Sequence, residues 1–336
     1  MIIGLEKTKT AVDSLTESPD YPNGPIRTHW VKINGLNTFY RTAGKKGDIL
    51  LLIHGGGSDY SGFIWKHTLP ALATRFRVIA LDLPGYGSSE LPNLLPDQSI
   101  LSFHSNFICE FLVELNIAKA HICGFSMGGG IALGFALAHP ERIKKLVLVN
   151  SYGLEKPVFG GLLTYLITRV DPLWLSLRWL IRHNRYIVRR GLRWSICDPE
   201  NITDELVDDA FQALRLQRLH PAWRIFQHQE ITLQGFRTTF LDDLEGLAKP
   251  TLFILSENDE LIPHKLVKPA LQQLKNARLY IARNAGHLLP REKPAEFNRV
   301  LMDFLSDNFV PKTGEKPVTA KKKDSSVSEP KPDTLP

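Results

Sequence analysis

The residues best suited to chemistry in this 336-residue chain form the segment Gly124–Gly128, which reads Gly-Phe-Ser-Met-Gly. The apolar run His121–Cys123 precedes it, and Gly129–Ala138, rich in Ala, Gly and Leu, follows it. A G-x-S-x-G sequence between a strand and a helix predicts a sharp turn that exposes the serine hydroxyl, with glycines where a β-carbon would collide. The helix would direct its N-terminal amides at charge developing on the serine. We therefore predict that Ser126 is a nucleophile.

A serine hydroxyl is a weak nucleophile and needs a base, which in turn is oriented by an acid. Two late histidines are candidates for the base. His287 lies in a loop just after the apolar run Leu279–Ile281, whereas His264 follows Pro263 and suits a helix start or the surface. Because a loop past a strand end can direct an imidazole at the serine, we assign the base to His287.

Three carboxylates compete for the role of the acid: Glu257, Asp259 and Glu260 all follow the apolar run Thr251–Leu255. Asp259 lies four residues past this run and four before Pro263, in a setting typical of a turn. We assign the acid to Asp259. The resulting chain order of serine, acid and histidine is the one that enzymes with this serine motif use.

A third signal is the run of three glycines, Gly55–Gly57, that follows the apolar run Ile49–Ile53 and His54. An oxyanion hole takes one backbone amide from such a loop and one from the residue after the nucleophile. We assign these donors to Gly56 and Met127. His54 has two interpretations, a base or a support of the glycine loop, and its place before the glycines favours support.

The elements that must position these residues alternate between strand and helix. Short, nearly continuous apolar runs are typical of strands buried on both faces of a parallel sheet. They lie at Ile49–Ile53, Val78–Leu81, His121–Cys123, Leu146–Val149, Leu252–Leu255 and Leu279–Ile281, and helical spacing separates them at Ser102–Leu115, Gly129–Ala138 and Pro294–Phe304. A hairpin, His29–Ile33 and Asn37–Arg41 around Asn34-Gly35, precedes them. The alternation predicts an α/β fold with a doubly wound, mostly parallel sheet.

The alternation is interrupted once, over residues 151–245, which read as several helices rich in Leu, Trp and Arg. Such an insertion between two core strands predicts a helical cap over the carboxyl ends of the strands, where open α/β sheets bind ligands. The core is then residues 25–150 and 246–310. We expect a flexible arm over residues 1–24 and a disordered basic tail over residues 311–336, because neither segment has much to bury.

Composition excludes several classes of protein. A hydrophobic content of 43% with 23% charged residues is ordinary for a globular protein. Cys109, Cys123 and Cys197 are too few and too widely spaced for a disulfide framework or a zinc cluster, so we expect reduced thiols. With no signal peptide, membrane span or nucleic-acid-binding pattern, we expect a cytoplasmic protein that needs no metal or organic cofactor.

The net charge of +6 has one conspicuous source within the cap. Five arginines are spaced four, three, four and four apart, which predicts one basic face of a helix: Arg178, Arg182, Arg185, Arg189 and Arg193. A basic amphipathic helix can contact an anionic membrane surface or attract acidic substrates. The alternative is a solvated face whose apolar side covers the active site. The sequence leaves these two interpretations open.

These segments together resemble the α/β-hydrolase superfamily over about residues 27–309. The residues that carry the resemblance are His54–Gly57, Asp82–Ser89, Gly124–Gly128, Asn258-Asp259, Gly286-His287 and Glu292–Pro294. The motifs are specific for the fold and poorly specific for the substrate. Epoxide hydrolases and haloalkane dehalogenases also resemble this chain, but they use Asp as the nucleophile, and Ser126 argues against both.

Within the superfamily, the glycine loop followed by Trp65 and the segment Asp198–Leu206 looks like the meta-cleavage-product hydrolases, which hydrolyse C–C bonds. Three features of that group are missing. Phe125 stands where the group has Asn, Leu288 where it has Trp, and Ala210 where it has a cap Arg for the acid group of the substrate.

The resulting hypothesis is a serine hydrolase that cleaves a small, hydrophobic carboxylic ester or related acyl compound through an acyl-enzyme. Its alternatives are a C–C hydrolase of the meta-cleavage-product type and an acyltransferase using the same triad. From a different class, a non-catalytic binding protein on the same fold is the rival. The oligomeric state is not predicted.

Overall fold

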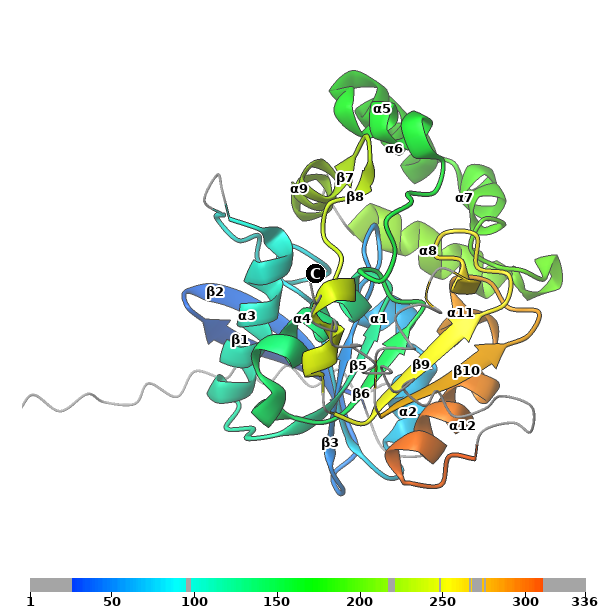
Figure 1. Ribbon diagram of the computed structural model, residues 1–336. Helices are drawn as coiled ribbons and strands as arrows, with labels where there is room; N and C mark the ends of the chain where they lie inside the picture. Colours follow the sequence, from blue (N-terminus) through cyan, green and yellow to red (C-terminus); the bar gives the residue numbers. More distant parts are fainter. Residues whose placement is uncertain are drawn as a thin grey trace, which may run out of the picture.

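The computed structural model describes residues 26–94, 98–216, 221–247, 249–265, 267, 274 and 276–310. The arm and the tail predicted from the sequence, residues 1–24 and 311–336, lie outside these residues. Figure 1 shows a central sheet covered by helices, with a further group of helices above the carboxyl ends of its strands.

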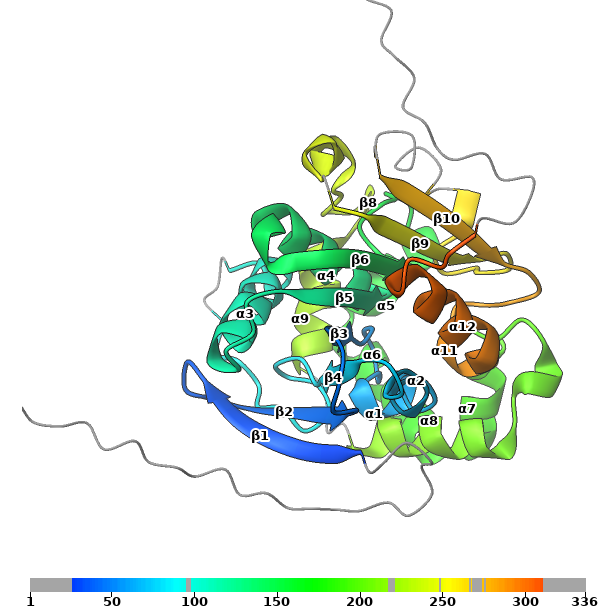
Figure 2. The same cartoon turned by 90° about the horizontal axis from the view of Figure 1, so that it is seen from below.

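The sheet has eight strands in the order β1-β2-β4-β3-β5-β6-β9-β10. The strands are β1 (Arg27–Ile33), β2 (Leu36–Ala43), β3 (Ile49–Ile53), β4 (Arg77–Leu81), β5 (Ala120–Phe125), β6 (Ile143–Val149), β9 (Thr251–Ser256) and β10 (Ala277–Ala282). β1 and β2 pair antiparallel, β2 joins β4 antiparallel, and the strands from β4 to β10 are parallel. Figure 2 shows the twist of this sheet from below. The predicted α/β fold with a mostly parallel sheet is confirmed, and each predicted strand lies within or at an observed one.

Helices pack on both faces of the sheet. One face carries α3 (Ile100–Glu114) and α4 (Met127–Ala138), and the other carries α1 (Ser61–Ile64), α2 (Thr68–Leu72), α11 (Leu289–Glu292) and α12 (Pro294–Leu305). In β3, Leu51 and Ile53 face the first group, and Leu50 and Leu52 face the second. Because both faces of the strand are buried, its sequence is apolar throughout and does not alternate.

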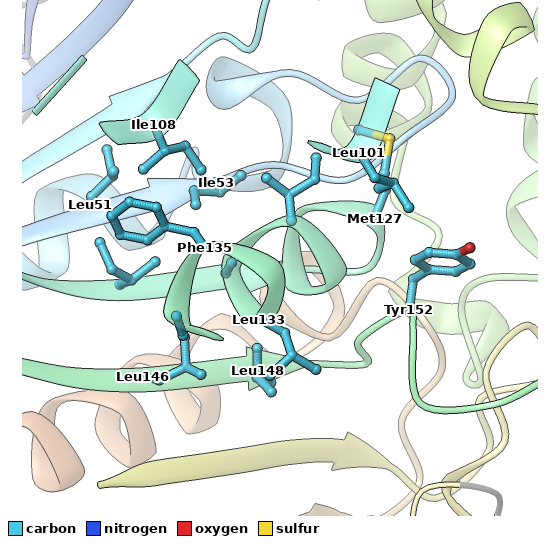
Figure 3. Packing of buried hydrophobic residues seen from close by; sticks show 14 of the residues in the cluster. Leu51, Ile53, Leu101, Ile108, Met127, Leu133, Phe135, Leu146, Leu148 and Tyr152 are labelled. Atoms are coloured by element: carbon cyan, nitrogen blue, oxygen red, sulfur yellow. The ribbon is translucent and has the colours of Figure 1, made fainter. Parts of the chain in front are cut away.

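The layer between β3, α3 and α4 shows how tightly this core is filled. Figure 3 shows the Phe135 ring of α4 beside Leu51 of β3 and Ile108 of α3. All three side chains are buried almost completely. Met127, at the start of the same helix, is buried as well, so the position of the α4 N-terminus is set by core packing.

The segment inserted between β6 and β9, the described residues of 151–246, is called the cap below. It contains α5 (Gly161–Arg169), α6 (Asp171–His183), α7 (Arg185–Leu192), α8 (Asp204–Leu216) and α9 (Pro221–Glu230), with the 3-10 turns Pro199–Asn201 and Leu241–Gly246. A short antiparallel pair, β7 (Ile231–Thr232) and β8 (Gly235–Phe236), lies among them. The helical insertion is confirmed, while the expectation of helices alone missed this hairpin.

The prediction that five arginines share one helical face is wrong. α6 ends at His183, and Asn184 caps α7 by accepting hydrogen bonds from the amides of Tyr186 (3.0 Å) and Ile187 (3.2 Å). An extended cap residue interrupts the helix, so the arginine spacing does not continue around one axis. The arginines are therefore divided: Arg178 and Arg182 lie on α6, Arg185 and Arg189 on α7, and Arg193 just after it.

The described part of the chain contains neither a membrane-spanning helix nor a metal-binding cluster. None of its helices is long and apolar enough to cross a membrane. No group of three or more His, Cys, Asp or Glu side chains in it is arranged to hold a metal ion. Cys109, Cys123 and Cys197 are free thiols.

Candidate active site

The turn at Ser126 connects β5 to α4 with the strained backbone that the motif predicts. Ser126 has φ 52° and ψ −121°, outside the regions that serine ordinarily adopts. A β-carbon at Gly124 would lie 2.3 Å from the carbonyl oxygen of Gly128, and one at Gly128 would lie 2.2 Å from the carbonyl oxygen of His54. Only glycine at both positions lets the turn close against the end of β3.

Ser126, His287 and Asp259 lie in one chain of hydrogen bonds. The His287 Nε2 atom is 3.0 Å from the Ser126 hydroxyl oxygen, and its Nδ1 atom is 2.7 Å from Asp259 Oδ2. The other carboxylate oxygen of Asp259 accepts hydrogen bonds from the amides of Leu261 and Ile262, both at 2.9 Å. Both oxygens are therefore held, and a carboxylate held in this way keeps an imidazole in one orientation.

Asn150, at the end of β6, is a residue that the sequence analysis did not identify. Its amide nitrogen donates to the His287 carbonyl (2.8 Å) and to the Ser256 hydroxyl (3.0 Å), and its amide oxygen accepts from the Ser256 amide (2.8 Å). Asn150 is fully buried, with φ 42°. It thereby ties the end of β9 to the loop that carries His287. In the sequence, the only feature that could have indicated this role is the position of Asn150 directly after a buried strand.

The competing candidates lie elsewhere. Glu257 and Glu260 are exposed, and Glu257 accepts a hydrogen bond from the Asn284 amide (3.1 Å). His264 is half-buried at a helical position past Pro263. Only Asp259, among the three acidic candidates, contacts His287.

His54 is buried, and both of its ring nitrogens are engaged. Nδ1 bonds the Gly55 carbonyl (2.7 Å), and Nε2 accepts from the Leu83 amide (3.0 Å). Burial lowers the pKa of His54 to about 4, so the ring is neutral at pH 7. Its bonds support the glycine loop and leave no nitrogen for the Ser126 proton.

Asp59 is a second residue of this loop that the sequence analysis did not identify. Its carboxylate accepts hydrogen bonds from the amides of Gly55 (2.6 Å) and Tyr60 (2.8 Å). Burial raises the pKa of Asp59 to about 8 despite these bonds and the nearby Arg291 charge. Gly56, which follows Gly55 in the same loop, packs against the ring of Trp223 on α9. A β-carbon at Gly56 would lie 2.3 Å from this ring. The cap thus contacts the loop that would supply an oxyanion donor.

Two cavities meet at Ser126. The larger, about 710 Å³, and the smaller, about 220 Å³, share Ser126, His287 and Trp223 among their lining residues. Met127 lines the smaller cavity, and Gly56 and Gly57 line the larger. As the first residue of α4, Met127 has an amide without an intrahelical acceptor.

The cap supplies most of the remaining cavity wall, including two arginines. Arg190 and Arg193 both line the larger cavity. Neither makes an ion pair within the described residues. Arg193 was predicted only as part of the basic face, and Arg190 was not singled out, because sequence spacing does not reveal which side of α7 faces the cavity.

The comparison with protein families identifies the chain. A model described as the alpha/beta hydrolase fold matches residues 48–294. The chain belongs to this family. The match runs from β3 to the first residue of α12, so it includes the cap and the strands β3 to β10 of this α/β-hydrolase, while β1 and β2 precede it.

Individual relatives are more distant. The chain is 29% identical over 291 residues to the uncharacterized hydrolase YugF of Bacillus subtilis, covering 84% of this chain and 98% of the relative. It is 27% identical over 273 residues to a 2-hydroxy-6-oxo-6-phenylhexa-2,4-dienoate hydrolase of Comamonas testosteroni, covering 79% and 90%. Among solved structures, a meta-cleavage product hydrolase of Pseudomonas fluorescens IP01 is 25% identical, with a TM-score of 0.69 over 83% of this chain and 98% of that chain.

The three residues that depart from the meta-cleavage-product pattern lie around the site. The Phe125 ring is 5.0 Å from the His287 ring, centroid to centroid. Leu288 and Ala210 line the larger cavity. The cavity of this α/β-hydrolase is thus apolar at the three positions where that group carries Asn, Trp and Arg.

Proposed function

We propose that this α/β-hydrolase is a serine hydrolase that cleaves carboxylic esters or related acyl compounds through an acyl-enzyme. The observation that carries the proposal is the continuous chain of hydrogen bonds from Ser126 through His287 to Asp259, at 3.0 and 2.7 Å. A serine hydroxyl, a histidine base and an acid that orients the histidine are the three groups of a Ser-His-Asp triad, which catalyses acyl transfer.

In the proposed reaction, His287 Nε2 takes the proton from the Ser126 hydroxyl as its oxygen attacks the substrate carbonyl. The backbone amides of Gly56 and Met127 donate to the oxyanion, and one such donor is typically worth roughly 2.7–4 kcal/mol of transition-state stabilisation. The C–O bond to the leaving group breaks, and the leaving oxygen takes the proton from His287. A water molecule, deprotonated by His287, then attacks the acyl carbonyl. The bond between this carbonyl and the Ser126 oxygen breaks, the acid leaves, and the Ser126 oxygen takes the proton back from His287.

The apolar wall supports a hydrophobic acyl or aromatic substrate. Phe63, Leu192 and Leu288 line the larger cavity, and Phe226 and Phe236 the smaller one. Since both cavities reach Ser126, the acyl and alcohol groups of an ester can occupy one each. The relatives named as meta-cleavage product hydrolases act on small substrates with aromatic or dienoate groups, which such a cavity would also accommodate.

A C–C hydrolase of the meta-cleavage-product type is the second candidate. The relatives favour it, and so do Arg190 and Arg193, whose charges border the larger cavity where a substrate carboxylate could pair. Phe125 and Leu288 oppose it, because an apolar side chain cannot replace the hydrogen bonds of Asn and Trp.

The test compares aryl esters of increasing acyl length with 2-hydroxy-6-oxo-6-phenylhexa-2,4-dienoate. We expect turnover of the esters by the wild type, loss of that turnover in Ser126→Ala, and at least a hundredfold lower kcat/KM on the dienoate. Faster cleavage of the dienoate would establish the C–C reaction instead. Transfer of the acyl group to an added alcohol in preference to water would identify an acyltransferase. If no ester is turned over and none forms an acyl-enzyme, the result would favour a non-catalytic binding protein on the same fold.

A further inference from the structure

The helix α5 has its apolar side facing solvent. Leu162, Leu163, Leu166 and Val170 lie within about 100° of one another around the helix axis and are 46–65% exposed. The opposite side carries Thr168, which is buried. Arg169, the last residue of the helix, donates hydrogen bonds from its guanidinium to the carbonyls of His228 (3.0 Å) and Ile231 (2.8 Å), which ties α5 to the end of α9 and to β7. A helix on the surface of a globular protein normally buries its apolar side and exposes its polar side.

The exposed apolar surface continues onto α6 and is concentrated in this part of the molecule. None of the thirteen residues of α6 is buried, and Trp179 is 64% exposed. Of the seventeen exposed large hydrophobic side chains in the described residues, twelve lie between Phe159 and Trp194. Figure 1 shows α5 and α6 at the top of the cap, the part farthest from the sheet. The tip of the cap, defined as residues 159–194, is therefore an apolar surface.

The same segment is strongly basic. Residues 159–194 contain seven arginines and one acidic side chain, a net charge of +6 with histidine neutral, which equals the net charge of the whole chain. The acidic residue, Asp171, is bound by Arg224. Arg185 and Arg189 pair with Asp204 of α8, but Arg182, Arg190 and Arg193 have no carboxylate partner in the part of the chain that the structure describes.

We infer that the tip of the cap docks on an anionic lipid surface, with α5 and α6 lying in the interface. Exposed leucines would enter the acyl region, Trp179 and Trp194 would lie at the headgroups, and the unpaired arginines would meet lipid phosphates. This replaces the single arginine face expected from the sequence: apolar side chains supply most of the contact, and only some of the arginines are free to take part.

Charge selects the lipid surface over a second copy of the chain. Two copies joined through this face would bring two sets of unpaired arginines together, and like charges at close range oppose association. An anionic bilayer offers both an apolar phase for the leucines and negative charge for the arginines.

The docking face also borders both cavities. Ile181 of α6 and Trp194 line the larger cavity, and Phe159 and Thr164 of α5 line the smaller one. The rings of Phe159 and Trp194 contact each other, with centroids 5.5 Å apart. If the proposed function holds, esters dissolved in the bilayer are the substrate class that this placement favours.

The test is flotation of the full-length protein with vesicles of phosphatidylcholine alone or mixed with phosphatidylglycerol. We expect binding to the mixed vesicles that falls severalfold between about 0.1 M and about 1 M salt, where the Debye length shrinks from about 10 to 3 Å. Replacing Leu162, Leu163 and Leu166 with Ser should lower the partition coefficient roughly tenfold or more.

Matched variants distinguish binding through the tip of the cap from non-specific adsorption to the vesicles. Leu163→Ser should weaken binding, whereas Val113→Ser, at a 53% exposed site on α3, should not. Arg182→Glu should weaken it, whereas Lys45→Glu, in the exposed turn between β2 and β3, should not. Ser126→Ala should float like the wild type, so the result does not depend on catalysis.

Three results would overturn the inference. The first is no binding to either vesicle, and the second is binding by the triple serine variant equal to that of the wild type. The third is a wild-type dimer that the triple variant dissolves, without vesicle binding, because the face would then join two copies of the chain.

Discussion

In β3, Leu50, Leu51 and Leu52 are fully buried between two layers of helices, whereas in α5, Leu162 and Leu163 expose 62% and 65% of their surface. Both segments are runs rich in leucine. The core strand has protein on both faces, but the leucines of α5 face solvent, and the buried side of that helix carries Thr168. The comparison teaches that an apolar run reports burial only when the fold supplies neighbours for it.

The core, which contains β3, and the cap, which contains α5, contribute different parts of the candidate site. The core holds Ser126, His287 and Asp259 through buried strand ends, hydrogen-bonded carboxylates and strained turns. The cap covers these residues, supplies the arginines and aromatic rings of the cavity wall, and leaves its tip apolar. Changes in the core should therefore affect chemistry and stability, and changes at the exposed leucines of α5, which line neither cavity, should affect neither in lipid-free buffer.

The largest effect is expected for the base. His287→Ala removes the group that would deprotonate Ser126, so kcat/KM on an aryl ester should fall by roughly 10⁴- to 10⁶-fold. His264→Ala, the other late histidine, is the control and should stay within about twofold of the wild type. Steady-state kinetics on both variants shows which of the two histidines the reaction requires. If the activity of His287→Ala stays within tenfold of the wild type, His287 is not the general base.

A smaller effect is expected at the joint between core and cap. Asp209 of α8 accepts hydrogen bonds from Lys66 and from Arg291, both at 2.7 Å, and the Arg291 side chain is almost fully buried. Asp209→Asn leaves this buried charge uncompensated, so the free energy of unfolding should fall by about 3 kcal/mol. Asp208→Asn breaks only an exposed pair with Arg185 and should lower it by less than about 1 kcal/mol. Equal urea midpoints for the two variants would contradict this.

The pH dependence of stability tests the buried carboxyl of the glycine loop. Burial raises the pKa of Asp59 from 3.8 to about 8. Between about pH 4 and pH 8 the native state keeps this proton and the unfolded chain loses it, so stability falls as the pH rises. Asp59→Asn should reduce that fall by several kcal/mol, up to about 5 kcal/mol for a pKa raised by about four units. Urea unfolding across this range checks it, with exposed Glu260→Gln as the control; an unchanged slope in Asp59→Asn would refute the assignment.

The smallest effect is expected at the tip of the cap. Leu163→Ala removes a side chain that water already surrounds, so the free energy of unfolding should change by less than about 0.5 kcal/mol. Leu52→Ala, in the fully buried strand, should lower it by about 2–5 kcal/mol. A loss above about 1 kcal/mol for Leu163→Ala would mean that α5 is covered in solution.

The core and the candidate triad could be predicted because their signals are local. Gly124 and Gly128 leave no room for a side chain, and the loops after two buried strands carry His287 and Asp259. Parallel strands end at one edge of the sheet, so these distant segments meet once the strand order is known.

The features that were missed depend on contacts between distant segments. The break at Asn184 was invisible because arginine spacing fits one helix or two, and the acidic partners that separate the arginines lie on α8. The ties made by Asn150 and the placement of Arg190 in the cavity wall arise only when β9 and the cap come together. Inverted amphipathicity in α5 could be recognised only after its buried side was known.

The central claim is that Ser126 is an activated nucleophile. Labelling of the native protein with a fluorophosphonate, followed by mass spectrometry of the peptides, measures this directly. The account predicts a single rapid modification at Ser126, lost in Ser126→Ala and slowed strongly in His287→Ala, while buried Ser151 stays unmodified. An unlabelled Ser126, or labelling that is equally fast without His287, would contradict it.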